Sequence, residues 1–451
     1  MPARHRKKVD AVVIGAGASG LAAARDLSQA GLRVIVVEAR SRVGGRVLTV
    51  HDSRSPVPLE LGAEFVHGEA PESLHAAQAA GLTVVELPDL HEVVTGGRFE
   101  VRHDFWETID RMNRDLAQRL ARRGKDFPVS DYIDSARVPS GKRQLLRDFV
   151  QGFHAAHPER LSAKALAAEV ANGGTENDQL DKQFRIVNGG DALMKWLRDG
   201  LDPDRVELRL STVVEAIQWK RGHVSVVCRG GDRTEITLSG RTAVVTLPVA
   251  ILKSGSIDFQ PAVPAKQRAL EQIETGQIFK IVLRFRQAFW ESSEFLKERR
   301  SKGHADGASM NFLHAPGAEI PTWWTALPVR GPLLTGWVGG VRAEALLSED
   351  PASRLERSLV SLSDVMAIPR RELEEQLDGW VSHDWRADPF ARGAYSYLGV
   401  GGFGAPRALA RPVAGTLFFA GEGTIADKIG TVAGALGSGR RAAREVLRAL
   451  K

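Results

Sequence analysis

The feature that most constrains this chain is a glycine-rich turn, Gly15–Gly20, set between an apolar run and a helical segment. Residues 9–14 have the pattern of a buried strand, residues 21–30 that of a helix, and residues 32–38 that of a second strand. Strand, glycine turn, helix and strand together form a βαβ unit, whose two strands are parallel. The sequence therefore predicts a Rossmann-like α/β fold.

The glycines of this turn have the spacing of a phosphate-binding loop. Gly15 permits a tight turn, Gly17 lets the backbone approach a pyrophosphate, and Gly20 allows the helix to pack closely on the strand. The N-terminus of that helix would then face the phosphates. A Rossmann-like unit without a ligand is the alternative interpretation of the same pattern.

Glu38 ends the second strand, at about the distance expected for the acid that binds a ribose. Such an acid accepts hydrogen bonds from both ribose hydroxyls and disfavours a 2′-phosphate, which leaves NAD and FAD open. A second glycine-rich turn follows, at Gly44 and Gly45, with Arg40 and Arg46 beside it. Guanidinium groups there are suited to a second face of a pyrophosphate.

A chain of 451 residues is too long for one simple core, so we expect two domains. The pattern is mostly helical from about residue 75 to 184, and strand signals return afterwards, among them Ile278–Phe285. No internal repeat or low-complexity linker separates these regions, so we expect the domains to be interleaved. The net charge of +6 is scattered, and its one dense run, residues 4–8, is interpreted as a solvated tail.

The single cysteine, Cys228, excludes an internal disulfide and a site built from two thiolates. The apolar run after the basic N-terminus is too short for a signal peptide, and no run of 18 apolar residues exists. We therefore expect a cytoplasmic protein with no metal site and no membrane or nucleic-acid partner.

Several segments resemble, in the same order, those of flavin-containing amine oxidases, the group of monoamine oxidases, polyamine oxidases and lysine-specific histone demethylases. They span almost the whole chain: Ala39–Arg46, Leu61–Gly68, Val244–Pro248 with Ile251–Lys253, His383–Tyr397, and Leu417–Thr424 with Gly430–Ala435. The resemblance implies a glutathione-reductase-type FAD-binding domain interleaved with an α+β substrate domain that carries a mixed sheet and helices. We expect the first in residues 1–75, 187–253 and 385–451, and the second in residues 76–186 and 254–384.

The resemblance also implies positions around FAD. Glu38 and Val214 would hold the adenosine half, Arg46 would lie near the pyrophosphate and flavin, Glu422 on the ribityl chain, and the Val432 backbone N–H at the flavin O2. The expected FAD contacts are Gly15, Gly17, Ala18, Ser19, Gly20, Glu38, Ala39, Arg40, Gly44, Gly45, Arg46, Gly62, Ala63, Glu64, Val214, Gly421, Glu422, Thr431 and Val432. Monoamine oxidases attach flavin through a cysteine just before their cage tyrosine, whereas Ser and Ala stand near Tyr395 here, so FAD should be non-covalent.

Amine oxidation removes a hydride from the carbon beside a neutral nitrogen, yet an alkylamine is only about 1 part in 10³ neutral at pH 7. A dry aromatic pocket lowers the pKa of the amine and supplies part of that cost. The resemblance makes Tyr395 one wall of this pocket and puts Thr431 where monoamine oxidases have a second tyrosine. The pocket would then be open on one side, with room for bulkier or secondary amines.

Lys280 stands in an otherwise apolar strand, where an unpartnered lysine is rare. The resemblance makes it the lysine that holds a water at flavin N5 and assists the reaction of reduced flavin with O2. His67 could orient a substrate nitrogen, and Trp385 could line the cavity. An outward-pointing lysine and a structural histidine are the alternatives.

These observations predict an oxidase that takes a hydride from a small-molecule amine onto FAD, releases an imine that hydrolyses to a carbonyl compound, and forms H2O2 from O2. The alternatives are a carbon–carbon desaturase of the carotenoid or porphyrinogen type and a flavoprotein binding module with little turnover. A polyamine would require acids along its tunnel, for which Glu64, Glu69, Glu169 and Glu176 are available, and an amino acid would require an arginine. We expect a monomer or homodimer without histone partners.

Overall fold

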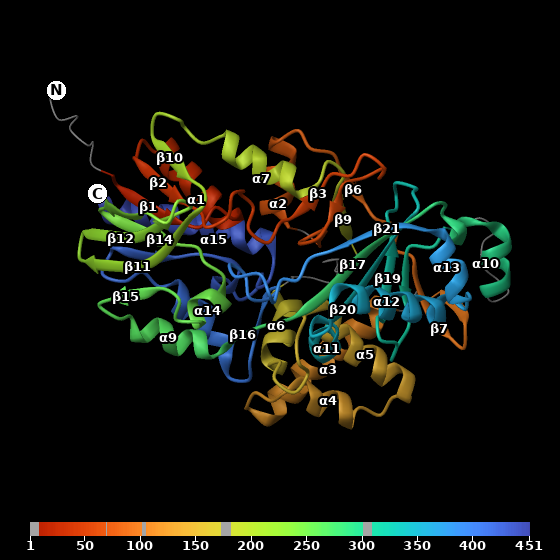
Figure 1. Ribbon diagram of the computed structural model, residues 1–451. Helices are drawn as coiled ribbons and strands as arrows, with labels where there is room; N and C mark the ends of the chain where they lie inside the picture. The colour runs from red at the N-terminus through yellow and green to blue at the C-terminus, as the bar shows by residue number, and fades with distance from the viewer. Residues whose placement is uncertain (1–8, 69, 102–104, 173–181, 301–308) are drawn as a thin grey trace.

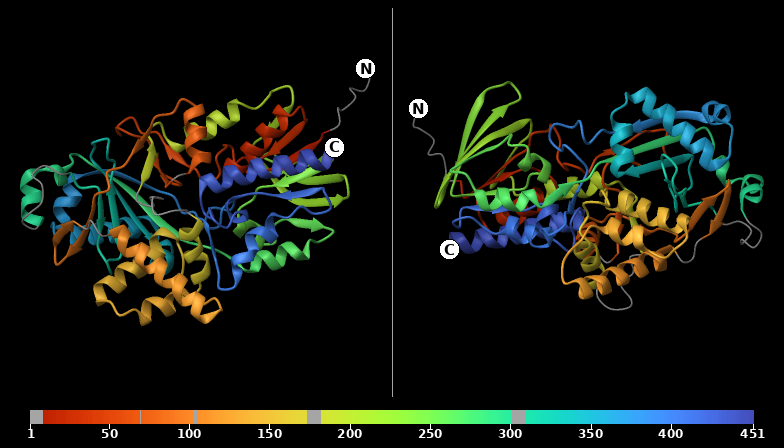
Figure 2. Two further views of the ribbon diagram at one scale, coloured as in Figure 1. Left: turned by 180° about the vertical axis from the view of Figure 1, so that it is seen from behind. Right: turned by 90° about the horizontal axis from the view of Figure 1, so that it is seen from below.

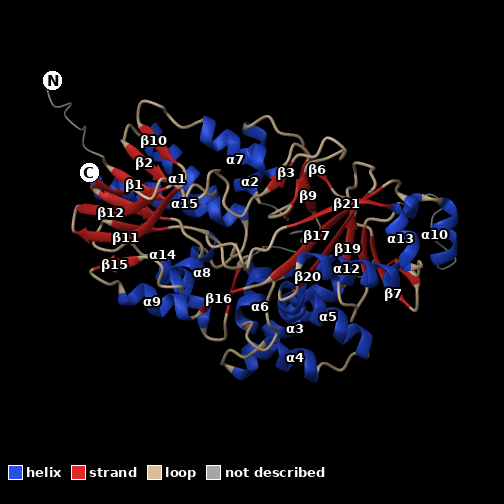
Figure 3. Ribbon diagram, in the orientation of Figure 1, coloured by secondary structure: helices blue, strands red, loops and turns tan. Residues whose placement is uncertain are grey.

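The computed structural model of the protein describes residues 9–68, 70–101, 105–172, 182–300 and 309–451. Its strands gather in two groups at opposite ends of the molecule, with loops and short strands between them (Figure 3). The basic run at residues 4–8 lies outside the described residues.

One group contains a five-stranded parallel sheet (Figure 1). Its order is β10 (Val206–Arg209), β2 (Val34–Val37), β1 (Ala11–Ile14), β14 (Thr242–Val245) and β23 (Leu417–Phe419). The strands are apolar and β-branched, and β1, β2 and β14 are buried throughout, as expected of strands covered on both faces. The Rossmann-like α/β expectation is confirmed.

Helices cover one face of this sheet. They are α1 (Ala18–Gln29), α2 (Pro71–Ala79), α7 (Gly190–Asp199) and α15 (Val432–Leu450). The two longest, α1 and α15, pack on each other, and α15 runs across the sheet in the view from behind (Figure 2). Small residues permit this contact, because a Cβ at Gly439 would lie 2.1 Å from the Ser19 carbonyl oxygen.

A second sheet covers the opposite face. Its order is β13 (Glu235–Gly240), β12 (His223–Gly230), β11 (Thr212–Lys220) and β15 (Asp258–Gln260). Side chains of β1 and β2 pack there against β11 and β12, which gives a layered body of helices, parallel sheet and second sheet. The helices α8 (Val249–Lys253), α9 (Pro264–Glu271) and α14 (Ala405–Ala410), with the 3-10 turns η2 (Gly402–Gly404) and η3 (Glu422–Thr424), complete this body.

The other group is a seven-stranded mixed sheet. Its order is β21 (Leu377–Ser382), β17 (Ile278–Phe285), β20 (Leu333–Gly339), β19 (Thr322–Thr325), β18 (Phe312–His314), β7 (His91–Thr95) and β8 (Arg98–Val101). All neighbours are antiparallel except β18 and β7. Its core includes side chains of α10 (Ser293–Arg299), α11 (Gly340–Leu347), α12 (Pro351–Met366), α13 (Arg370–Gln376) and η1 (Phe289–Glu291).

Four helices form a separate cluster below the seven-stranded sheet in Figure 1. They are α3 (Phe105–Arg123), α4 (Val129–Ser135), α5 (Ser140–Phe153) and α6 (Ala163–Asn172). Short strands join the two groups: β3 (Thr49–Val50) with β4 (Leu59–Glu60), β5 (Phe65–His67) with β9 (Gln183–Ile186) and β6 (Val84–Glu86), and β16 (Ile273–Thr275) with β22 (Ser396–Leu398). The domain limits expected from the sequence stay a prediction.

Candidate functional site

A cavity of about 1300 Å³ extends between the two groups of strands. One end is lined by the glycine turn after β1, and the other by aromatic residues of the seven-stranded sheet and of α5. Every residue proposed from the sequence as a site residue, except Gly20, lines it. The fold therefore brings segments from both ends of the chain to one cavity.

The glycine turn has the geometry that its spacing predicts. Gly15 has a φ of +103°, a conformation that favours glycine. A Cβ at Gly20 would lie 1.9 Å from the Gly15 carbonyl oxygen, so only glycine lets α1 approach β1 this closely. A Cβ at Gly17 would meet no atom within 4 Å, because its backbone faces the open cavity at the N-terminus of α1. This turn fits a phosphate group.

Glu38 lies at the end of β2, only 5% exposed. One carboxylate oxygen accepts a hydrogen bond from the Ala16 N–H at 2.8 Å, and the other accepts one from the Arg40 N–H at 2.9 Å. These bonds fix the carboxylate at the cavity wall, next to Ala39 and Val214. An acid held in this way can accept further hydrogen bonds from ligand hydroxyls.

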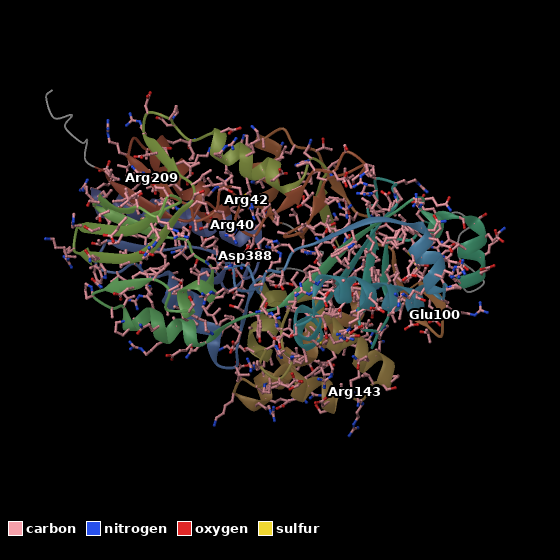
Figure 4. All side chains as sticks on the ribbon, in the orientation of Figure 1. Arg40, Arg42, Glu100, Arg143, Arg209 and Asp388 are labelled. Atoms are coloured by element: carbon pink, nitrogen blue, oxygen red, sulfur yellow. The ribbon has the colours of Figure 1, made fainter. Side chains whose placement is uncertain are left out.

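The second glycine turn packs on the first. Gly44 and Gly45 have φ values of +101° and +58°, and the Gly44 N–H donates to the Ala16 carbonyl at 2.9 Å. Beside them, the Arg40 guanidinium donates to Asp388 at 2.5 Å, and both residues lie near the middle of the molecule (Figure 4). Arg40 is thus held by an acid from the opposite end of the chain.

Arg46 and Glu422 form an ion pair across the cavity wall. The Arg46 guanidinium donates to Glu422 Oε1 at 2.9 Å and to the Ala394 carbonyl at 2.6 Å. Glu422 Oε2 accepts from the Gly430 N–H at 3.1 Å. Glu422 thereby ties the segment after β23 to the segment before α15, at positions that the sequence assigned to the flavin.

Positions 62 and 421 also require glycine. A Cβ at Gly62 would lie 1.9 Å from the Arg46 carbonyl oxygen, and Gly421 has a φ of +129°. Ala63 lines the cavity next to Gly62. These close contacts hold the Leu61–Gly68 segment against the second glycine turn.

Lys280 lies on β17, the strand next to the edge strand β21 of the seven-stranded sheet, and is 2% exposed. Its ammonium donates to Glu64 at 2.5 Å and lies 5.6 Å from the ring centroid of Trp324. The lysine is therefore a buried, paired group at the cavity, and the outward-pointing alternative does not describe it.

Glu64 has two further partners, Arg185 of β9 at 2.9 Å and the Trp324 indole N–H at 3.2 Å. Burial alone raises the pKa of Glu64, but Lys280 and Arg185 outweigh burial and hold the pKa below its usual value. Glu64 is thus an anion between two cations. Arg185 was missed from the sequence because its partners are remote in the chain and only the fold reveals them.

Tyr395 lines the cavity, and its hydroxyl donates to the Phe153 carbonyl at 2.9 Å. Burial raises the pKa of Tyr395 far above its usual value, so the ring stays neutral. Gly430 packs on this ring, because a Cβ there would lie 3.1 Å from it. Tyr397 also lines the cavity, and burial raises its pKa to about 12.

Thr431 precedes α15 and caps it. Its side chain accepts from the Gly434 N–H at 2.9 Å and donates to the Lys428 carbonyl at 2.8 Å. Both Thr431 and Val432 line the cavity, so the N-terminus of α15 faces it. The capping role was not anticipated from the sequence.

His67 is on β5, with its ring centroid 5.0 Å from that of Phe153. Its Nδ1 is buried without a hydrogen-bond partner in the described part of the chain, and burial lowers its pKa to about 4. A neutral imidazole with a free nitrogen at the cavity wall can pair with a polar ligand atom. Trp385 is fixed instead, because its indole N–H donates to the Leu61 carbonyl at 2.9 Å.

An aromatic wall surrounds these groups. It consists of Phe65, Phe149, Phe153, Phe312, Trp324 and Trp337. The ring centroids of Trp324 and Trp337 lie 5.9 Å apart, and those of Phe149 and Phe153 lie 5.1 Å apart. This half of the cavity is suited to an apolar ligand.

Among the acids considered for a polyamine tunnel, only Glu64 can be placed. Glu69 and Glu176 lie outside the described residues, and so does the side chain of Glu169. Within the described ranges, no three His, Cys, Asp or Glu residues are grouped to hold a metal ion. None of the described helices has the length and apolarity needed to cross a membrane.

Comparison with known proteins gives consistent matches. A sequence model described as flavin containing amine oxidoreductase matches residues 18–447. Human lysine-specific histone demethylase 2 is 27% identical over 98% of the chain, and polyamine oxidase 3 of Oryza sativa subsp. japonica is 28% identical over 96% of the chain and 88% of its own length. The chain spans 30–58% of the length of three demethylase relatives.

Solved structures agree on the fold. A putrescine oxidase bound to putrescine has a TM-score of 0.78 and 22% identity, with 98% of this chain and 99% of that chain covered. Cyclohexylamine oxidase from Brevibacterium oxydans has a TM-score of 0.79 and 20% identity, with the same coverage.

Proposed function

Because the chain belongs to the family of flavin-containing amine oxidoreductases, whose cofactor is FAD, we propose that it oxidises a small, largely apolar monoamine. Bound FAD would take a hydride from the carbon beside the amine nitrogen and pass the electrons to O2, giving H2O2, while the imine hydrolyses to a carbonyl compound. The observation that carries the proposal is one continuous cavity that joins a phosphate-binding glycine turn to an aromatic wall.

The residues at the glycine end fit FAD. Gly17 leaves room for a pyrophosphate at the N-terminus of α1, and Glu38 is placed for ribose hydroxyls. Arg46 and the N-terminus of α15 extend a positive potential along the cavity, which favours an anionic ligand. The one cysteine, Cys228, is buried in β12 outside the cavity lining, which supports non-covalent binding.

The aromatic end favours the neutral amine. Tyr395 and the aromatic wall stabilise an ammonium poorly once water is displaced, so the amine loses its proton more easily there. His67 would orient the substrate nitrogen through its unpartnered Nδ1. Lys280, positioned by its hydrogen bond to Glu64, would fix a water or a developing negative charge near the reacting atoms.

The paired acids support a monoamine over a diamine. Glu64 is taken by Lys280 and Arg185, and Asp148 is taken by Arg342 and by the Gly317 N–H at 2.8 Å. A second ammonium in the aromatic half would therefore meet no free carboxylate on these residues. The exposed Asp427, on the loop before α15, is an acid of the cavity lining without such a pairing.

The test is anaerobic mixing of the purified, flavin-loaded protein with matched amines while the flavin absorbance is followed. Cyclohexylamine and putrescine are suitable probes, because oxidases named for them share this fold. We expect bleaching by cyclohexylamine, peroxide formation when air is admitted, and reaction with putrescine at least tenfold slower. Efficient oxidation of putrescine would contradict the monoamine assignment and make Asp427→Asn the next variant to test.

If no nitrogen compound bleached the flavin, the proposal that the protein oxidises amines would be overturned. It would favour the carbon–carbon desaturase or the binding module instead. His67→Leu supplies a further check, since it keeps the apolar wall and removes the nitrogen proposed to orient the substrate. We expect about a tenfold lower kcat/KM, with the FAD content unchanged.

A further inference from the structure

Two histidines that the proposed reaction does not use lie together on the cavity wall. His91 starts β7 and His314 ends the parallel neighbour β18. His91 Nδ1 and His314 Nε2 are 2.8 Å apart, and the ring planes differ by only 8°. The two imidazoles are therefore joined edge to edge by one hydrogen bond, and both line the cavity.

Aromatic rings hold this pair in one plane. Phe105 stacks on both imidazoles, with centroid distances of 4.5 Å to His91 and 4.6 Å to His314. Phe312 stacks on His91 at 4.9 Å. Burial, and then His91 itself, hold the pKa of His314 well below its usual value, so His314 is neutral at pH 7.

A carboxylate orients the chain of hydrogen bonds. His91 Nε2 lies 3.3 Å from Asp89, which also accepts from the Trp106 indole N–H at 3.1 Å. A carboxylate favours an N–H that points toward it, and the His91 tautomer with its proton on Nε2, beside Asp89, accepts on Nδ1. His314 must then donate from Nε2, which leaves its Nδ1 as an acceptor.

The acceptor His314 Nδ1 has no hydrogen-bond partner among the described residues, and His314 lines the cavity. Two charged residues of the lining do not favour a second ammonium, because Asp148 is already paired with Arg342 and Arg114 adds an exposed cation. A neutral donor such as a hydroxyl matches a neutral imidazole acceptor, because a polar group left unpaired becomes costly once a bound ligand displaces water from the aromatic wall.

We propose that His314 is a specificity-determining residue that accepts a hydrogen bond from a hydroxyl at the end of the amine remote from the reacting carbon. His91 and Asp89 are positioning residues that keep His314 in the accepting tautomer. The substrate class is then a monoamine with an apolar ring or chain and a distal hydroxyl. This inference rests on the proposed amine oxidation.

Two matched substrate pairs test it: 4-aminocyclohexanol with cyclohexylamine, and 4-hydroxyphenethylamine with phenethylamine. We expect the flavin-loaded enzyme to prefer the hydroxylated member in kcat/KM by roughly tenfold, as one hydrogen bond in an apolar pocket allows. His314→Leu should abolish that preference and change kcat/KM for the plain amine by no more than about twofold. His91→Phe should reduce the preference, and His91→Gln, whose amide oxygen can accept, should restore part of it.

His154→Leu is the matched control, because it removes another imidazole of the cavity lining that lies outside this hydrogen-bonded chain. The His154→Leu enzyme should keep the preference for the hydroxylated amine. A wild-type enzyme without preference, or a preference that survives His314→Leu, would overturn the proposal.

A binding measurement separates this proposal from the proposed function. Isothermal titration of 4-methylphenol, which has no amine, into the flavin-loaded protein should show a Kd about tenfold higher in His314→Leu than in the wild type. Equal affinities would overturn the hydroxyl subsite whether or not any amine is oxidised. Loss of oxidation of every plain amine would instead contradict the proposed function.

Discussion

Lys280 could be recognised from the sequence, whereas the ion pairs around it could not. Lys280 was recognisable because it interrupts an apolar strand, and the structure places it at the cavity. Its partner Glu64, and Arg185, which pairs with Glu64 in turn, come from parts of the chain far from Lys280, so these contacts follow from the tertiary fold alone. Glu64 was interpreted as a flavin or tunnel residue, and its use as the counterion of two cations was not foreseen.

Glu64→Gln should destabilise the protein, because it leaves the buried Lys280 ammonium without its carboxylate. We expect the free energy of unfolding to fall by about 3 kcal/mol, the usual cost of breaking a buried ion pair. Urea unfolding of Glu64→Gln, Lys280→Met and the double variant forms a cycle that isolates the pair. Additive losses in the double variant would show that the two side chains do not interact.

Glu60 should make stability depend on pH. Burial raises its pKa to about 7 from 4.5, against hydrogen bonds from the Gly190 N–H and Thr49. Between these two values the folded state holds a proton that the unfolded state has lost, so the free energy of unfolding should fall as pH rises, by up to about 3 kcal/mol. Urea unfolding at pH 5 and pH 7.5 measures this difference. Glu60→Gln should flatten it, and an unchanged slope in that variant would refute the assignment.

Helices and strands were predicted well where their sequence pattern is long or is bounded by glycines. The βαβ unit around α1 and the strand Ile278–Phe285 match the structure, because glycines or uniform burial define them. The short β7 and β8 were missed within a region interpreted as mostly helical. β7 is held by its pairing with β18, and β8 by its pairing with β7, and no local pattern indicates either contact.

Two glycines one helical turn apart should respond differently to the same change. Gly20→Ala places a Cβ 1.9 Å from the Gly15 carbonyl oxygen, so α1 must move and the apoprotein should lose about 2–3 kcal/mol of stability. Gly17→Ala meets no protein atom within 4 Å, so it should leave the apoprotein intact and weaken FAD binding at least tenfold. Thermal unfolding of the apoproteins and FAD titration separate the two effects. Equal apoprotein stability of both variants would contradict this account.

At the scale of the whole molecule, the cavity is the contact region between the parallel-sheet body and the seven-stranded sheet. Its wall takes residues from β1, β5, β17 and α15, which lie in widely separated parts of the sequence. The sequence predicted this cavity only through the segments that resemble, in the same order, those of flavin-containing amine oxidases. The shape of the aromatic half depends on packing of β18, β19 and α5 that no motif specifies.

FAD should therefore stabilise both bodies together. At a free FAD concentration 100 times its Kd, the free energy of unfolding should rise by about 2.7 kcal/mol. Differential scanning calorimetry of the apoprotein with FAD should show one transition that moves to higher temperature. FMN, which lacks the adenosine half expected at Glu38, should raise it much less, and equal stabilisation by FMN would refute that placement.

The last strand of the parallel sheet, β23, and the helix α15 that packs on α1 come from the final 35 residues of the chain, 417–451. During synthesis the glycine turn is therefore made about 400 residues before these neighbours. We therefore expect FAD to bind stably only after β23 and α15 are in place. A chain that terminates before residue 417 lacks both β23 and α15, so it should bind FAD poorly.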